Sequence, residues 1–358
     1  MDREQAIRLM QDLLKRMVEK KGSDLFITAG FPPAIKVDGE IRPQSDRSLS
    51  AEQSASLVRA IMNDRQTKEF DSTKECNFAI APPGIGRFRV SAFVQQGYTG
   101  AVLRTINAKI PTLEELELPP VLKEVVLAKR GFVILVGGTG SGKSTSLAAM
   151  VGYRNEKTRG HIVTIEDPVE YVHAHKGCVI THREVGVDCE SWHLALKNTL
   201  RQAPDVILIG EIRDRETMEA TIALAGTGHL CIATLHANNC AETLDRIINM
   251  FPRDQHNQIF LDLSQYLRAI LSQRLVLAKS GIRVAASEVM VNTPHVSELI
   301  KKGDVIGVKE AIRTGTERGM LSFDSSLYNL VREGRIELEE ALASADSRTN
   351  LEAKINFG

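Results

Sequence analysis

A chain of 358 residues with 43% hydrophobic residues is long enough for two ordinary globular domains. Its 45 acidic residues balance its 45 basic residues, so it lacks the overall basic excess of a nucleic-acid-binding protein. The five cysteines form no Cys-x-x-Cys pair, which favours reduced thiols. There is no secretory signal, and no apolar stretch reaches the ~20 residues that span a bilayer. We therefore expect a cytoplasmic protein without a transmembrane segment or a nucleic-acid partner.

Residues 1–106 have the mixed pattern of a small α+β domain. Apolar residues at 6, 10, 13, 14 and 17 have the spacing of one helical face. Asp38-Gly39 between two short β-like runs predicts a tight hairpin, and Ser50 with Gln53 forms a capping box that begins a second helix. In the strand predicted at 87–94, Phe88, Val90 and Ala92 share one face, and Arg87 and Arg89 share the other.

The pattern changes after residues 107–120, a segment with three prolines that we expect to be a linker. Residues 121–292 alternate helices with apolar runs typical of buried parallel strands, at 132–136, 161–165, 205–209 and 229–235. Two further strands are predicted at 274–277 and 284–290. From 293 to 358 the periodicity is helical, and the chain ends in a polar tail. The expected fold class is α/β with a smaller N-terminal domain.

The most specific motif follows the apolar run 132–136 and reads Gly137-Gly-Thr-Gly-Ser-Gly-Lys-Ser144. Its glycines let consecutive backbone N–H groups surround an anion, its lysine reaches the β- and γ-phosphates, and its hydroxyl binds Mg²⁺. A helix that begins near Lys143 adds the positive end of its dipole. The motif predicts a nucleotide site formed by Gly137, Gly138, Thr139, Gly140, Ser141, Gly142, Lys143, Ser144 and Thr145.

Carboxylates follow two other predicted strands. Glu211 comes directly after the run 206–209 and Gly210, at a position suited to Mg²⁺; Gly210 replaces the aspartate usual there. Glu166 and Asp167 follow the strand 161–165 and would lie beside the phosphate loop if the two strands were neighbours. Glu166 is either the base that activates water or a solvated acid at a strand end.

Histidines occur in two groups. His229 and His236 flank one predicted strand and, at an odd spacing, are expected on opposite faces, one nearer phosphate and one nearer an interface. His173, His175, Cys178 and His182 lie within ten residues and could be drawn as a metal site. Because their side chains need not converge on a strand and turn, surface histidines are favoured there.

Four segments together resemble the boxes of the secretion ATPase superfamily: 137–144 (Walker A), 164–168 (Asp box), 201–213 (an atypical Walker B) and the pair 227–229 and 234–236 (His box). Segments 22–25, 38–39, 87–90 and 320–324 resemble the twitching-motility ATPases of type IV pili within it. The resemblance covers almost the whole chain. The absence of a Cys-x-x-Cys pair separates it from type II secretion ATPases, which carry a zinc-binding insert.

The resemblance implies a PAS-like N-terminal domain, a RecA-like P-loop ATPase domain with a helical C-terminal extension, and a ring of six subunits. It implies ATP and Mg²⁺ as ligands, with Glu166 as general base, Glu211 and Ser144 at Mg²⁺, and His229 as a γ-phosphate sensor. Arginines of the N-terminal domain would help to close the site. Arg87, Arg89 and Arg104 fit that role, although each is equally compatible with a surface position on a strand.

One departure bears on which motor this is. PilT-type retraction ATPases carry a segment reading roughly Ala-Ile-Arg-Asn-Leu-Ile-Arg-Glu, whereas residues 295–302 here read His-Val-Ser-Glu-Leu-Ile-Lys-Lys. With its longer C-terminus, the chain resembles the PilU branch. This resemblance implies an accessory retraction motor at the inner-membrane face. Such a motor would work with a PilT-type paralogue on the platform protein. The alternatives are a principal PilT-type motor, a secretion or DNA-translocation ATPase, and a ring that binds ATP but scarcely hydrolyses it.

Overall fold

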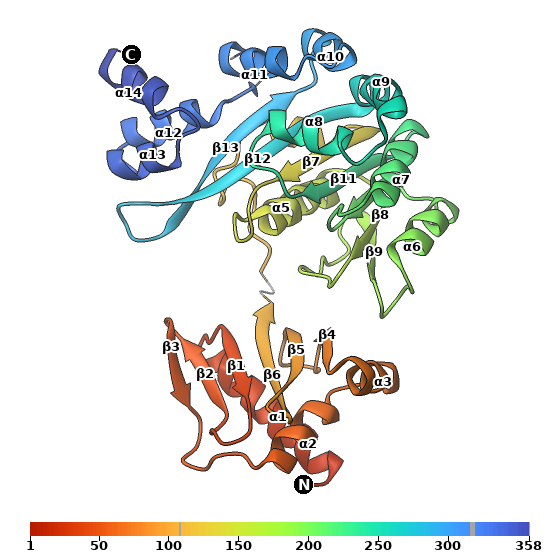
Figure 1. The fold of residues 1–358 in the computed structure, drawn as a ribbon, viewed down its shortest axis with the longest axis vertical. Helices are drawn as coiled ribbons and strands as arrows, with labels where there is room; N and C mark the ends of the chain where they lie inside the picture. Colours follow the sequence, from red (N-terminus) through yellow and green to blue (C-terminus); the bar gives the residue numbers. More distant parts are fainter. Residues whose placement is uncertain (107–108, 316–318, 358) are drawn as a thin grey trace. The chain divides into compact units, whose positions relative to one another are not determined.

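The computed structural model describes residues 1–106, 109–315 and 319–357, and the chain divides into two compact units, Met1–Lys109 and Ile110–Gly358 (Figure 1). The division falls inside the segment predicted as a linker. Residues 107 and 108 of that segment lie outside the described residues. Its remainder packs on the second unit, because Leu113 and Leu118 are buried in that unit's core.

The first unit is an antiparallel sheet with helices packed on one face (Figure 1). The described strands lie in the order β3-β2-β1-β6-β5-β4, and each neighbouring pair is antiparallel. The strands are β1 (Asp24–Ile27), β2 (Ala34–Val37), β3 (Glu40–Pro43), β4 (Glu75–Ile80), β5 (Arg87–Gln95) and β6 (Tyr98–Ile106). The helices are α1 (Arg3–Glu19), α2 (Ala51–Ala60) and α3 (Asp64–Thr73).

Local sequence signals explain these elements. The five apolar positions predicted for the first helix are all buried in α1, and each leucine or methionine among them contributes about 1.5–3 kcal/mol when it leaves water. The capping box of Ser50 and Gln53 begins α2. Asp38 and Gly39 both have positive φ, 51° and 84°, and they turn β2 into β3. The alternation in β5 is as expected, with Phe88, Val90 and Ala92 buried.

The second unit is built on a seven-stranded sheet in the order β13-β12-β7-β11-β10-β8-β9 (Figure 1). Every neighbouring pair is parallel except β12 with β13. The strands are β7 (Gly131–Val136), β8 (Gly160–Glu166), β9 (Cys178–Glu184), β10 (Val206–Ile209), β11 (Leu230–Leu235), β12 (Leu267–Leu277) and β13 (Arg283–Val291). The α/β class predicted from the sequence is confirmed, although β9 is additional and β12 begins seven residues before the predicted strand.

Helices cover both faces of this sheet, as the uninterrupted burial of β7 requires. Phe132, Ile134 and Val136 face one layer, formed by α6 to α11, while Val133 and Leu135 face α4 and α5. The helices of these layers are α4 (Val121–Val126), α5 (Lys143–Lys157), α6 (Trp192–Thr199), α7 (Arg215–Gly226), α8 (Cys240–Ile248), α9 (His256–Tyr266), α10 (Pro294–Lys301) and α11 (Val305–Thr314). Short 3₁₀ turns occupy Leu200–Gln202 and Arg253–Gln255.

The C-terminal extension packs on the hairpin of β12 and β13. It consists of α12 (Phe323–Arg332), α13 (Leu338–Ser344) and α14 (Arg348–Phe357). Their core includes Val276 and Ala286 of the hairpin together with Leu327 and Leu351. Residues 348–357 of the predicted polar tail form a helix that buries Leu351.

Arg274 of β12 joins this extension to the sheet. Its guanidinium donates to Ser344 O at 2.7 Å and to Asp346 Oδ1 at 2.5 Å, and it lies 4.0 Å from the ring centroid of Phe323. It also donates to Asn238 O at 3.2 Å, in the loop that follows β11. One side chain thus connects three segments that are distant in sequence.

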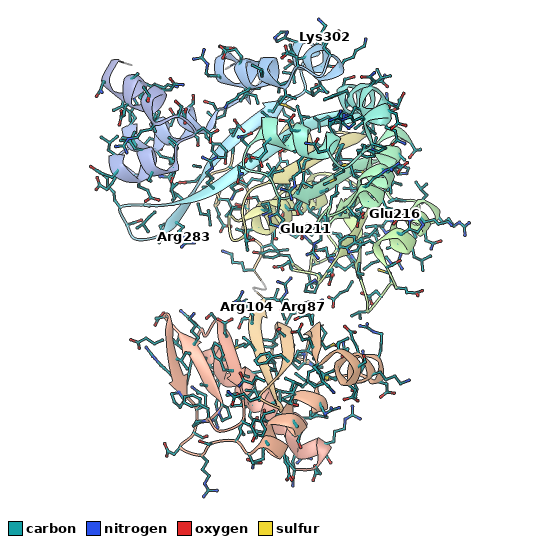
Figure 2. All side chains as sticks on the ribbon, viewed as in Figure 1. Arg87, Arg104, Glu211, Glu216, Arg283 and Lys302 are labelled. Atoms are coloured by element: carbon teal, nitrogen blue, oxygen red, sulfur yellow. The ribbon has the colours of Figure 1, made fainter. Side chains whose placement is uncertain are left out.

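Arg274→Ala is expected to loosen helices α12 to α14 locally. Hydrogen bonds to charged groups contribute roughly 1.5–3 kcal/mol, so the free energy of local opening should fall by about 2 kcal/mol. Amide hydrogen exchange in residues 323–357 should then become about 30-fold faster. The control is Arg283→Ala, an exposed arginine of the same hairpin (labelled in Figure 2). Equal exchange in both variants would contradict this account.

Candidate active site

The parallel strands end at one edge of the sheet, and the predicted site residues follow several of them. The phosphate loop follows β7, His236 follows β11, Glu211 comes one residue after the end of β10 beyond Gly210, and Glu166 ends β8. The strand order β7-β11-β10-β8 places them in that sequence along the edge. In open α/β sheets this carboxyl edge is where ligands bind.

The phosphate loop leads directly into α5. Gly142 is the N-cap of α5 with φ +88°, a left-handed conformation that favours glycine. The Lys143 ammonium donates to Gly137 O and Gly138 O, both at 2.8 Å. Burial lowers the pKa of Lys143, and the charge of Glu211 acts in the opposite direction. The charge of Glu211 thus partly offsets the effect of burial on the pKa of Lys143.

The hydroxyls of the loop have different surroundings. Ser144, predicted at Mg²⁺, is exposed. Thr145 Oγ1 lies 2.9 Å from the hydroxyl of Tyr171, so the segment after Glu166 returns to the start of α5. Ser141 Oγ is buried and has no hydrogen-bond partner. The loop thus leaves the Ser144 hydroxyl at the surface, where a ligand can reach it.

Glu211 (labelled in Figure 2) is held by two cationic or polar neighbours. Arg213 donates to Glu211 Oε2 through Nε at 2.9 Å and through Nη2 at 2.8 Å. His236 Nε2 lies 3.1 Å from Glu211 Oε1. The hydrogen bond to Glu211 raises the pKa of Arg213. Both carboxylate oxygens are therefore oriented before any ligand binds.

The donor atoms at this edge of the sheet are of the kind that binds Mg²⁺. It prefers oxygen ligands and usually takes one or two protein ligands with substrate phosphates and water. The exposed Ser144 hydroxyl and the Glu211 carboxylate are oxygen donors of this kind. No group of three or more His, Cys, Asp or Glu side chains among the described residues is arranged to hold a metal ion without further ligands.

Glu166 is buried at the end of β8 and accepts a hydrogen bond from the backbone N–H of Glu170 at 3.2 Å. Its strand is not a neighbour of β7, so the condition on which the sequence placed it beside the loop is not met. Three strand spacings of about 4.8 Å separate β8 from β7, a distance of about 14 Å. Within one chain, Glu166 lies beyond Glu211 as seen from the loop.

The position of Glu166 explains why a glycine is found at position 210. A Cβ added to Gly210 would lie 3.2 Å from Glu166 Cα and 3.3 Å from Glu166 Cγ. A side chain at position 210 would therefore make tight contacts with the backbone and the stem of Glu166. Glycine at this position of the Walker B segment leaves room for Glu166 beside it.

The expectation for His229 does not fit the geometry of its own chain. His229 precedes β11, and its backbone C=O accepts from the N–H of Gly131, the first residue of β7. The phosphate loop follows the other end of β7, roughly 16 Å away over five residues of strand. His236 follows β11 and lies beside Glu211. Within one chain, His236 is therefore the histidine at the carboxyl edge, where ligands meet the strands of such sheets, and the γ-phosphate role of His229 stays a prediction.

The histidine cluster at 173–182 is only partly a surface feature. His175 is exposed, but His173 is 6% exposed and its ring stacks on His182 at 5.9 Å between centroids. Burial, with the nearby His182 and Lys176, lowers the pKa of His173 to about 4. The expectation of surface histidines is thus wrong for His173, because it packs as a neutral ring.

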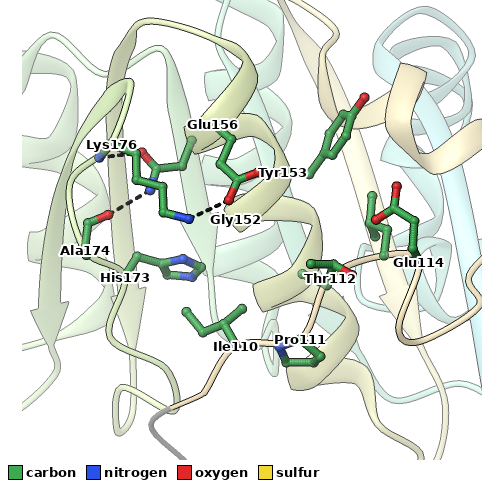
Figure 3. A pocket seen from close by; sticks show the side chains of 13 residues that line it. Ile110, Pro111, Thr112, Glu114, Gly152, Tyr153, Glu156, His173, Ala174 and Lys176 are labelled. Atoms are coloured by element: carbon green, nitrogen blue, oxygen red, sulfur yellow. Dashed lines mark hydrogen bonds and ion pairs between the residues drawn. The ribbon is translucent and has the colours of Figure 1, made fainter.

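His173 also lines a cavity of about 110 Å³ on the flank of α5 (Figure 3). The opposite wall is the segment 110–114, which follows the first unit in sequence. Lys176 pairs with Glu156 at its rim. The lining residues of α5 run from Ala149 to Glu156, so the cavity is separate from the loop at its N-terminus.

The three candidate arginines belong to the first unit. Arg89 and Arg104 lie directly opposite each other on β5 and β6, and both are exposed. Arg104 (labelled with Arg87 in Figure 2) donates to Asp24 Oδ1 at 2.8 Å. Burial alone would raise the pKa of Asp24, but hydrogen bonds from Ser23 and Arg104 lower it overall. Arg104 is thus anchored in its own domain.

Comparison with known proteins shows the family of this chain. A family model described as "Type II/IV secretion system protein" matches residues 1–288. The chain is 56% identical to the type IV pilus ATPase PilU of Pseudomonas aeruginosa, over 97% of this chain and 91% of PilU. The chain belongs to the pilus retraction ATPases of this family. It is also 43% identical to the retraction ATPase PilT of the same organism, over 93% of this chain and 97% of PilT.

Solved structures of related ATPases have the same fold. A crystal structure of the pilus retraction motor PilT with bound ADP matches with a TM-score of 0.90 and 37% identity, over 96% of this chain and 98% of that one. The ATPase DotB of Legionella pneumophila matches with a TM-score of 0.84 and 27% identity, over 93% of this chain and 94% of DotB. The family and the two-part fold class predicted from the motifs are confirmed. No helix among the described residues is long and apolar enough to cross a membrane.

Proposed function

We propose that this pilus retraction ATPase is the accessory, PilU-type motor. It acts as a homo-hexamer at the inner-membrane face of the cytoplasm, together with a PilT-type paralogue on the pilus platform protein. The observation that supports the accessory role is the 56% identity to PilU against 43% to PilT from one organism, over nearly the whole chain in each case. The altered segment at 295–302, which forms α10, points the same way.

In the proposed reaction, water attacks the γ-phosphorus of ATP, the bond to the bridging oxygen breaks, and ADP and phosphate leave. The backbone of the loop and Lys143 bind the phosphates, and Glu166 accepts the proton of the attacking water. Bound Mg²⁺, held by Ser144 and Glu211, would neutralise phosphate charge. His236 and Arg213 orient Glu211. We assign Arg87, Arg89 and Arg104 to closing the site over the nucleotide.

A measurement of pilus retraction force in living cells tests the proposed accessory role. In a strain that lacks this chain, pili held in an optical trap should still retract but stall at lower force. Re-expression of the wild type should restore the force, and Lys143→Ala should not. Unchanged force under load would contradict the accessory role, and a complete loss of retraction would favour a principal PilT-type motor.

A DNA translocase with the same core is the second candidate class. The balanced charge of the chain speaks against it, because such proteins bind phosphate backbones through a basic excess. ATP hydrolysis by the purified protein, with and without single- and double-stranded DNA, separates the two. A rate that DNA raises several-fold would support the translocase.

A further inference from the structure

Gln273 of β12 is a buried polar residue that the hydrolysis steps above do not use. Its side chain is 4% exposed, in a strand whose neighbours are mostly apolar. β12 runs parallel to β7, with Ser272 opposite Val136, so Gln273 comes level with the point where β7 ends and the phosphate loop begins. A buried amide is stable only when it is hydrogen-bonded, and the recorded partner of Gln273 is Ser146 in the first turn of α5.

The side chain of Gln273 meets the end of the loop and the start of α5. The Ser146 hydroxyl, itself fully buried, donates to Gln273 Oε1 at 2.7 Å. The amide nitrogen lies beside Gly142, where an added Cβ would come within 2.7 Å of Gln273 Nε2. The amide thus occupies the space that a side chain at position 142 would need.

The backbone of Gln273 meets the beginning of the loop. A Cβ added to Gly137 would lie 2.4 Å from the Gln273 carbonyl oxygen. One residue of β12 therefore contacts the first glycine of the motif through its backbone, and the last glycine and the first turn of α5 through its side chain. The loop between these glycines, residues 138–140, is exposed.

We propose that Gln273 is a positioning residue that holds the phosphate loop in the form that binds polyphosphate. This inference rests on the proposed function, in which the loop binds ATP. A loop fixed at both ends keeps its N–H groups directed inward before the ligand arrives, and less conformational freedom is lost on binding. Without the amide, the loop and the first turn of α5 relax, and Lys143 and Ser144 move with them.

The test compares Gln273→Leu, which replaces the amide with an apolar side chain of similar length, with Ser146→Ala, which removes only the hydrogen bond to Oε1. Gln273→Leu should weaken ATP and ADP binding about 10-fold, with a smaller effect in Ser146→Ala. KM for ATP should rise by a similar factor while kcat changes less, because the loop holds the phosphates in the ground state as well as the transition state. In the absence of nucleotide, amide hydrogen exchange in residues 137–146 should be faster in Gln273→Leu than in the wild type.

The matched control is Asn292→Ala. Asn292 lies just after β13, and its amide donates to Ser264 O and Leu267 O, both at 2.9 Å. Its loss removes two hydrogen bonds at the other end of β12, where Leu267 lies opposite Phe132, without touching the loop, so stability should fall with KM unchanged. The inference would be overturned if Gln273→Leu had the same ATP affinity and the same amide exchange rates in the phosphate loop as the wild type. If the wild type failed to bind ATP, the proposed function would fail, and the exchange of the loop amides would still decide the role of Gln273.

Discussion

Lys143→Ala is expected to reduce ATP hydrolysis by at least about 100-fold, because it removes the only side-chain cation of the phosphate loop. The ammonium is half-buried and held by two loop carbonyls at 2.8 Å, so it is preorganised as a donor to phosphate. Isothermal titration with ATP and Mg²⁺, together with phosphate release, measures both consequences. Binding should weaken strongly, and turnover should fall to background.

The control for this variant is Lys157→Ala. Lys157 is the last residue of the same helix, α5, and its side chain is exposed beside the ring of Tyr153. The Lys157→Ala substitution removes the same charge from the other end of the helix, so ATP binding should be retained. If Lys143→Ala bound and hydrolysed ATP as Lys157→Ala does, the phosphate loop would not be the nucleotide site.

Glu166→Gln is expected to slow hydrolysis by about 10²- to 10⁴-fold while ATP binding is kept, because the amide cannot accept the proton of the attacking water. Glu166 is buried at the end of β8 and its backbone packs closely on Gly210, so the shape of the site should survive the change. Single-turnover phosphate release measures the chemical step, and a binding titration in parallel confirms that the nucleotide is held.

Glu288→Gln is the matched control for the loss of a buried carboxylate. Glu288 of β13 accepts from the backbone N–H of Cys240 at 2.6 Å, and burial raises its pKa. An amide oxygen can replace that acceptor, so turnover should stay near the wild-type rate. Wild-type turnover in Glu166→Gln would remove Glu166 as the base and shift attention to Glu211.

The phosphate loop is predictable from the sequence because its function resides in contiguous residues. Backbone N–H groups, one lysine and one hydroxyl lie within Gly137 to Thr145, and no tertiary contact is needed to recognise them. The same is true of the capping box at Ser50 and of the turn at Asp38 and Gly39, where local chemistry alone sets the conformation. The residues of that loop as a nucleotide site remain a prediction until binding is measured.

The order of the strands in the sheet depends on contacts between distant residues, so it could not be predicted from the local sequence. Two strands, β11 and β10, lie between β7 and β8, so Glu166 is not beside the loop as the sequence suggested. The role of His229 stays a prediction. The motif contains two histidines, and only the direction of β11 shows which one reaches the carboxyl edge. His236 meets that condition.

Gln273 is the residue that sequence reasoning missed. It lies about 130 positions after the loop, and its contact with Gly137, Gly142 and Ser146 exists only because β12 pairs with β7. The available signal was weak but physical: Ser272 and Gln273 are polar residues within an apolar strand, and both are buried. A polar interruption of this kind calls for a partner in the fold.

Phosphate release by the purified wild-type chain, measured with ATP and Mg²⁺ and with Lys143→Ala as the blank, tests most directly whether this site hydrolyses ATP. We expect steady turnover that depends on Mg²⁺ and disappears in the variant. Wild-type protein that binds ATP, yet releases no more phosphate than Lys143→Ala, would contradict the account and would leave a protein that binds nucleotide without hydrolysing it.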